Sequence, residues 1–185
     1  KPSEGRDILI AKFSGAGERI WSSYYGSKNN EWAFGICTDN KGSIYIAGGS
    51  WSKDLDVAGG FQKKLKGERD AIIAKFDTSG KRLWGTYYGG SSEIDDDASL
   101  LIDNANNISV NNKNHVLVGG YTNSKDVFGE GGFQKEYGGG EQEGWIALIK
   151  DYPVTTGQPE PTSNCHGDII RVPYILEETL EDKFE

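Results

Sequence analysis

The sequence predicts an all-β fold assembled from a repeated unit. The stretch 7–26 returns at 70–89, a constant spacing of 63 residues, and both copies read Asp-x-x-Ile-Ala-Lys-Phe, a glycine-containing turn and then Trp-x-x-Tyr-Tyr-Gly. A gapless duplication of this kind predicts a repeat architecture. The composition agrees, because 26 glycines and an aromatic content of 11% are typical of short strands joined by tight turns.

Charge and hydropathy narrow the classes of partner. The chain has 185 residues, enough for one domain with a sizeable core, and its formal net charge is −8. An acidic surface disfavours the phosphate backbone of nucleic acid and an anionic membrane face. No apolar run is long enough to span a membrane, so we expect a soluble chain without membrane insertion.

The cysteines and the start of the chain carry two further expectations. Cys37 and Cys165 lie far apart with no close-spaced partners for a zinc site, so we expect two unpaired or buried thiols and leave open whether they pair. The chain contains no methionine and begins at Lys1, from which we expect a processed product, an expressed segment or a piece of a longer protein.

The first unit contains two hairpins and a loop. Apolar strands at 7–13 and 19–26 are separated by Ser-Gly-Ala-Gly, which is strong hairpin punctuation. Strands at 32–39 and 43–49 are joined by Asp-Asn-Lys-Gly, in which we expect Asp39 to form an Asx turn that closes the hairpin. The loop 50–67 follows and contains Ser-Lys-Asp and Gly-Gly-Phe-Gln-Lys.

The second unit repeats this order with one change. The loop motifs return at 124–126 and 131–135, farther from their first copies than 63 residues, so we expect the Asn-rich stretch 104–114 to be an insertion that lengthens a tight turn. A third unit opens at 144–150 and stops. The strands expected in the second unit are 70–76, 82–89, 97–103 and 115–120.

The composition changes from residue 152. Prolines with Thr, Gly and Gln make 152–162 a linker. The tail 163–185 contains one stretch, 168–176, that could form a strand confined to a sheet edge by its proline, and it ends in acidic residues.

The repeat resembles a known family. A unit of four strands and about sixty residues has the size of one β-propeller blade with a long loop. Its motifs closely resemble the bacterial SBBP ("seven-bladed beta-propeller") repeat, over 1–151, in cycles 5–66 and 67–140 and a partial cycle 141–151. The motifs that carry the resemblance are Asp-Ala-Ile-Ile-Ala-Lys-Phe, Leu-Trp-x-Thr-Tyr-Tyr-Gly-Gly, Asp-Asn-Lys-Gly-Ser-Ile-Tyr-Ile-Ala-Gly and Gly-Gly-Phe-Gln.

This resemblance implies a partial propeller of four-stranded blades, about two and a fraction repeats, in an exported bacterial protein. The innermost strand of a blade would be 32–39 or 97–103, and the outermost would be the Trp-Tyr-Tyr strand. Because an open fragment exposes strand edges, we expect further segments of the same chain, another copy, or strand 168–176 to supply the missing neighbours. The stretch 163–174 resembles the opening of Ig-like modules of Bacteroidetes-type surface proteins, with an unstructured extension or a docking strand as the alternative.

An acidic loop is the candidate for a metal site. Glu93, Asp95, Asp96 and Asp97 crowd one loop, and calcium takes oxygen ligands. Their spacing matches no EF-hand, so we favour a solvated acidic loop and no cofactor, with calcium as the alternative.

Three tryptophans are the candidates for ligand contact. Trp32, Trp51 and Trp145 do not recur between the units, whereas the Trp-x-x-Tyr-Tyr residues recur and are expected to pack between blades. The unrepeated tryptophans are therefore the surface candidates, and a glycan site would place them beside carboxylates such as Glu93 or Asp95.

The remaining polar residues do not form a catalytic set. His115 and His166 have no serine or cysteine at a spacing recognisable for nucleophilic catalysis, and Lys12 and Lys75 are expected to be outward-facing charges. We therefore predict no enzyme activity, and a structural and interaction module of an exported protein at the outer cell surface of a Gram-negative bacterium. A carbohydrate-binding or glycan-active propeller is the alternative.

Overall fold

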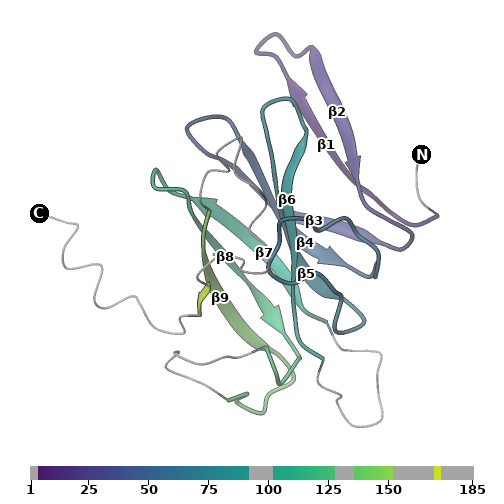
Figure 1. Ribbon diagram of the computed structural model, residues 1–185, viewed down its shortest axis with the longest axis vertical. Helices are drawn as coiled ribbons and strands as arrows, with labels where there is room; N and C mark the ends of the chain where they lie inside the picture. The colour runs from purple at the N-terminus through teal and green to yellow at the C-terminus, as the bar shows by residue number, and fades with distance from the viewer. Residues whose placement is uncertain (1–3, 92–101, 128–135, 152–168, 172–185) are drawn as a thin grey trace, which may run out of the picture.

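The computed structural model describes residues 4–91, 102–127, 136–151 and 169–171, and within them the chain is all-β, as predicted, with no helix. It has three antiparallel sheets, which we name the N-terminal hairpin, the middle sheet and the C-terminal sheet (Figure 1). The N-terminal hairpin contains β1 (Ile8–Phe13) and β2 (Arg19–Tyr25); the middle sheet contains β3 (Glu31–Thr38), β4 (Ile44–Ser50), β5 (Asp70–Phe76) and β6 (Arg82–Tyr88), in that spatial order; the C-terminal sheet contains β7 (Asn104–Val110), β8 (His115–Thr122), β9 (Glu143–Lys150) and β10 (Ile169–Arg171), also in order.

The three sheets pack face against face in chain order, with the middle sheet between the other two (Figure 1). One apolar cluster joins Ile8, Ile10 and Tyr25 of the hairpin to one face of the middle sheet. A second cluster joins the other face of the middle sheet to β8 and β9. Strands β4 and β5 are consequently buried along their whole length, which explains why they read as continuous apolar runs.

The four tight hairpin turns share one conformation. They begin at Ser14, Asp39, Asp77 and Asn111, whose side-chain oxygens each accept the backbone N–H groups two and four residues further on. The predicted Asx turn at Asp39 is therefore present. The fourth residue has positive φ in every case and is Gly17, Gly42, Gly80 or Asn114, because glycine and asparagine tolerate the left-handed region.

Strand β7 corrects the predicted layout of the second unit. The first strand of the C-terminal sheet is Asn104–Val110 and not 97–103, and Asn111–Asn114 is a tight turn and not a lengthened one. Equivalent residues are 63 apart at Gly26 and Gly89 and 72 apart at the corresponding turns, so the extra residues lie between 89 and the start of β7. The insertion was misplaced because Asn114 adopts the conformation that glycine has in the other three turns.

The tail contributes one strand to the C-terminal sheet. β10 lies within the predicted segment 168–176 and pairs with β9 as its fourth strand. Among the described residues no helix could serve as a membrane span.

Candidate functional site

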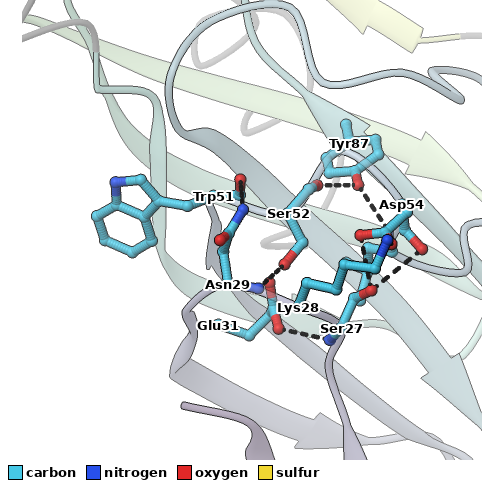
Figure 2. Close-up of polar contacts among 9 residues, drawn as sticks. Ser27, Lys28, Asn29, Glu31, Trp51, Ser52, Asp54 and Tyr87 are labelled. Carbon is cyan, nitrogen blue, oxygen red and sulfur yellow. Dashed lines mark hydrogen bonds and ion pairs between the residues drawn. The ribbon is translucent and has the colours of Figure 1, made fainter. Parts of the chain in front are cut away.

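A polar network occupies the corner where β3 begins and β4 ends (Figure 2). The buried Glu31 carboxylate accepts a hydrogen bond from the Ser50 hydroxyl at 2.7 Å and another from the Ser27 N–H at 2.8 Å. The Ser50 Oγ also accepts the Ser52 N–H at 3.0 Å. We call Ser27, Glu31, Ser50, Ser52 and Asp54 the corner network.

The corner network ties two loops to the middle sheet, as Figure 2 shows. The Ser52 Oγ accepts the Asn29 N–H at 2.9 Å, and the Tyr87 hydroxyl donates to the Ser52 carbonyl at 2.5 Å. Asp54 accepts the Ser27 hydroxyl at 2.8 Å and pairs with Lys28 at 3.1 Å on the exposed side. The repeated Ser-Lys-Asp motif therefore holds a loop in place.

The same arrangement recurs in the C-terminal sheet. Asp103 takes the place of Glu31, and its carboxylate accepts hydrogen bonds from Thr122, Ser124 and the Gly90 N–H. Burial raises the pKa of the Asp103 carboxyl. Recurrence of an entire bonding pattern in both sheets, with Glu exchanged for Asp and Ser for Thr, identifies these carboxylates as structural groups.

Asp70 is a second buried carboxylate beside this network. It accepts the N–H groups of Lys66 and Gly67 at 2.9 and 3.0 Å and the Gln62 side-chain amide at 2.6 Å. Burial raises the pKa of Asp70 to about 6, and the nearby Asp103 carboxylate acts in the same direction.

Aromatic and arginine side chains gather on the other side of the same corner. Trp32 stacks with Phe34, with ring centroids 6.1 Å apart, and lies 6.4 Å from Trp51. The Arg6 guanidinium lies 5.1 Å from the Trp32 ring centroid, and that of Arg69 lies 4.7 Å from the Trp51 ring. Trp51 points away from the corner network in Figure 2. We call these five residues the aromatic–arginine cluster.

The aromatic residues of the cluster are 39% (Trp32) and 50% (Phe34) exposed, and Trp51 is half-buried. Phe34 is the extra residue of a bulge in β3, so it has no cross-strand partner in β4. Bulges redirect side chains, and they are common next to binding sites. The predicted surface residues Trp32 and Trp51 thus lie together and share a face with Phe34.

Trp145, the third predicted candidate, lies elsewhere. It is only 6% exposed, packs edge-on against Tyr88 with centroids 4.7 Å apart, and donates its indole N–H to the Tyr121 carbonyl. Trp145 takes the place of Ile72 in the repeat and therefore faces the middle sheet.

The predicted calcium candidates Glu93, Asp95, Asp96 and Asp97 lie outside the described residues. Within the described ranges no group of three or more His, Cys, Asp or Glu side chains is arranged to hold a metal ion. His115 is half-buried beside the Asn111 turn, while His166 and Cys165 lie outside the described residues. Burial raises the pKa of the half-buried Cys37 thiol to about 11.

A buried ion pair corrects the expectation that Lys75 faces outward. Its ammonium lies 2.5 Å from Asp151, between the middle and C-terminal sheets. Asp151 also accepts the Tyr45 hydroxyl at 2.7 Å and the Trp84 indole N–H at 3.0 Å. Burial, together with Asp151, raises the pKa of Tyr45. At the equivalent junction Lys12 and Trp21 donate to the Thr78 carbonyl, so the sequence pattern fixed the lysine position but not its acceptor.

Sequence reasoning missed Phe34 and both arginines. A signal for the arginines was present, because Arg6 and Arg69 are 63 residues apart and each directly precedes the repeated Asp. Their backbone carbonyls also accept equivalent hydrogen bonds, from Glu31 and Asp103.

The chain has no recognised relatives to guide the assignment. No protein-family model matches it, and no curated protein matches it significantly.

Proposed function

We propose that this chain is a non-catalytic structural and interaction module, a partial β-propeller of the SBBP type, which joins further repeat units through its two end faces. We place it in an exported bacterial protein or assembly at the outer cell surface. That location rests on the resemblance of its repeats to those of secreted bacterial proteins. The observation that supports the module most directly is a difference in exposure between equivalent residues of successive units.

The N-terminal hairpin exposes a face that is covered in the middle sheet. Leu9 is 59% exposed while its equivalent Ile72 is fully buried, and Tyr24 is 62% exposed while Tyr87 is fully buried. Phe13 is likewise exposed and its equivalent Phe76 buried. The middle sheet buries these positions against the hairpin, so the same face of the hairpin suits another unit of the same kind. We call Leu9, Phe13 and Tyr24 the leading face.

The C-terminal sheet exposes the opposite half of the same interface. Leu117 and Ile146 are 46% and 54% exposed, whereas their equivalents Tyr45 and Ile73 are fully buried against the C-terminal sheet. We call Leu117 and Ile146 the trailing face. The chain therefore contains two complete junctions between units and one unmatched half of a junction at each end.

The non-catalytic assignment is supported by what the buried ionisable groups do. Glu31 and Asp103 cap equivalent corners, Asp70 binds backbone N–H groups, and Lys75 pairs with Asp151. Each of these groups is already used in holding strands, loops or sheets together.

Solution mass as a function of concentration tests the proposal. We expect the weight-average mass from light scattering to rise above 20.2 kDa with concentration, because exposed apolar faces that fit one another associate. Leu9→Ser combined with Phe13→Ser should keep the chain monomeric. Ile20→Ser is the matched control, because Ile20 is exposed on the same hairpin but its equivalent Leu83 stays 42% exposed in the middle sheet. A wild-type chain that remains monomeric throughout would overturn the proposal.

Carbohydrate binding is the second candidate function, and the aromatic–arginine cluster favours it. Exposed aromatic rings provide apolar faces on which sugar rings stack. Intrinsic tryptophan fluorescence, measured against a panel of polysaccharides, tests it, and the absence of any shift would count against it.

A further inference from the structure

We infer that the aromatic–arginine cluster binds an acidic polysaccharide, a polymer that carries uronate carboxylates. This inference rests on the second candidate function, carbohydrate binding, and names the class of sugar. Three features of the cluster support it: uncompensated positive charge, a substitution pattern between the two sheets, and a surrounding of planar amides.

The two guanidinium groups lack carboxylate partners within the described ranges. The only ion pairs there join Lys28 to Asp54, Lys75 to Asp151 and Arg82 to Asp56. Arg69 is only 8% exposed, donates one hydrogen bond to the Tyr121 hydroxyl at 2.9 Å, and has no partner for its Nε. A buried charge without a counter-charge is unfavourable, so an anionic group bound here would stabilise the site.

The equivalent corner of the C-terminal sheet has the same backbone and different side chains. Asn104, Asn106 and Asn123 take the places of Trp32, Phe34 and Trp51, and Asn106 is again the extra residue of a bulge. Since both corners fold alike, the shared backbone does not demand aromatic rings. The aromatic surface is thus specific to one corner, as expected of a recognition surface.

Amide groups surround the aromatic surface. The Asn29 side chain donates to the Trp51 carbonyl at 3.1 Å, and Asn30 accepts the Arg6 N–H at 3.1 Å. Asn104 lies beside Arg69, because a Cβ placed on Gly49 would be 2.7 Å from the Asn104 Oδ1 and 3.2 Å from the Arg69 Nε. Amides hydrogen-bond to hydroxyl groups as both donors and acceptors.

These groups match the chemistry of a uronic acid. Its ring presents apolar C–H faces to tryptophan, its carboxylate suits the planar fork of a guanidinium, and its hydroxyls suit amides. Arg6 and Arg69 begin equivalent strands in successive units, so positive charge recurs along the stack, and a polymer presents carboxylates at regular intervals. The net charge of −8 opposes nonspecific adherence of a polyanion, which confines binding to this cluster.

Isothermal titration of the full chain with polygalacturonate, with neutral dextran and with poly-glutamate as separate probes tests the inference. We expect measurable binding of polygalacturonate alone. Trp32→Ala and Arg6→Gln should each weaken it about tenfold or more, from the lost ring contact and the lost charged hydrogen bond. Tyr24→Ala and Arg19→Gln, which change an exposed aromatic and an exposed arginine of the hairpin, are matched controls and should leave the affinity unchanged.

Four outcomes would overturn the inference. Equal binding of dextran would leave carbohydrate binding standing but remove the acidic specificity. Equal binding of poly-glutamate would show that charge alone is recognised. No binding of any polysaccharide would remove both the inference and the second candidate function. Unchanged affinity in Trp32→Ala and Arg6→Gln would place the site elsewhere.

Discussion

Removal of the Asp151 charge should destabilise the junction between the middle and C-terminal sheets. Asp151→Asn keeps the size of the side chain but leaves the Lys75 ammonium, 2.5 Å away and buried, without a counter-charge. Breaking a buried ion pair by removal of one partner costs about 3–5 kcal/mol. Because one hydrogen-bond acceptor remains for Tyr45 or Trp84, we expect a loss in the lower part of that range. For a chain of this length it corresponds to a fall in Tm of about 6–16 °C.

Urea unfolding followed by circular dichroism at pH 7 measures this loss. The repeat supplies the control, because Lys12 is equivalent to Lys75 but reaches only a backbone carbonyl, at 3.4 Å. We therefore expect Lys12→Met to change the free energy of unfolding by less than about 0.5 kcal/mol. In the Asp151→Asn background, Lys75→Met should cost much less than it does alone. A loss below about 1 kcal/mol in Asp151→Asn, or strict additivity of the two changes, would refute the reasoning.

Three further predictions use equivalent residues or pH in the same unfolding assay. Gly80 and Gly17 have similar positive φ, 85° and 82°, but a Cβ on Gly80 would lie 2.9 Å from an indole ring while one on Gly17 would meet nothing. We expect Gly17→Ala to cost about 1–2 kcal/mol and Gly80→Ala about 1–3 kcal/mol more. Tyr87→Phe removes two buried hydrogen bonds and should cost about 2 kcal/mol, whereas Tyr24→Phe on the exposed counterpart should change little. The raised pKa of Asp70, about 6, means that the folded chain binds this proton more tightly than the unfolded chain. The contribution of Asp70 to the free energy of unfolding should therefore fall, by on the order of 3 kcal/mol, as pH rises from about 4 to about 6, and then stay constant.

Each of these three has a contrary result. Equal losses in Gly17→Ala and Gly80→Ala would show that the indole contact carries no energy. A Tyr24→Phe loss as large as that of Tyr87→Phe would contradict the burial difference. The difference in unfolding free energy between wild type and Asp70→Asn should decrease with pH between about 4 and about 6, and an increase would contradict the sign.

The strand layout was predictable where turn chemistry was explicit. Glycine at the fourth turn position, as in Gly42, marked three hairpins correctly. The fourth was missed because Asn114 replaces that glycine, and an Asn-rich stretch was interpreted as an insertion. The structure shows that a polar, Asn-rich strand such as β7 can pair in the same register as the apolar β3, because backbone hydrogen bonds and a shared bulge set that register.

The candidate site was predictable only in part. Trp32 and Trp51 were selected because they do not recur, and the structure brings them together through pairing of β3 with β4. Trp145 was selected by the same rule, but sheet alternation turns it into the core. The pairing of Lys75 with Asp151 joins residues 76 positions apart, and no local pattern indicates such a contact.

The leading and trailing faces give the chain a direction. They are the two halves of one heterologous interface, so contacts through them relate successive units by the same rotation and translation at every step, and a twofold-symmetric dimer does not arise from them. Such a series closes into a ring if the rotation divides a full circle and extends into a fibre if it does not. The two junctions inside the chain already set that rotation. A substitution that changes the angle at either of them would therefore alter the number of units in the closed assembly and not only a local contact.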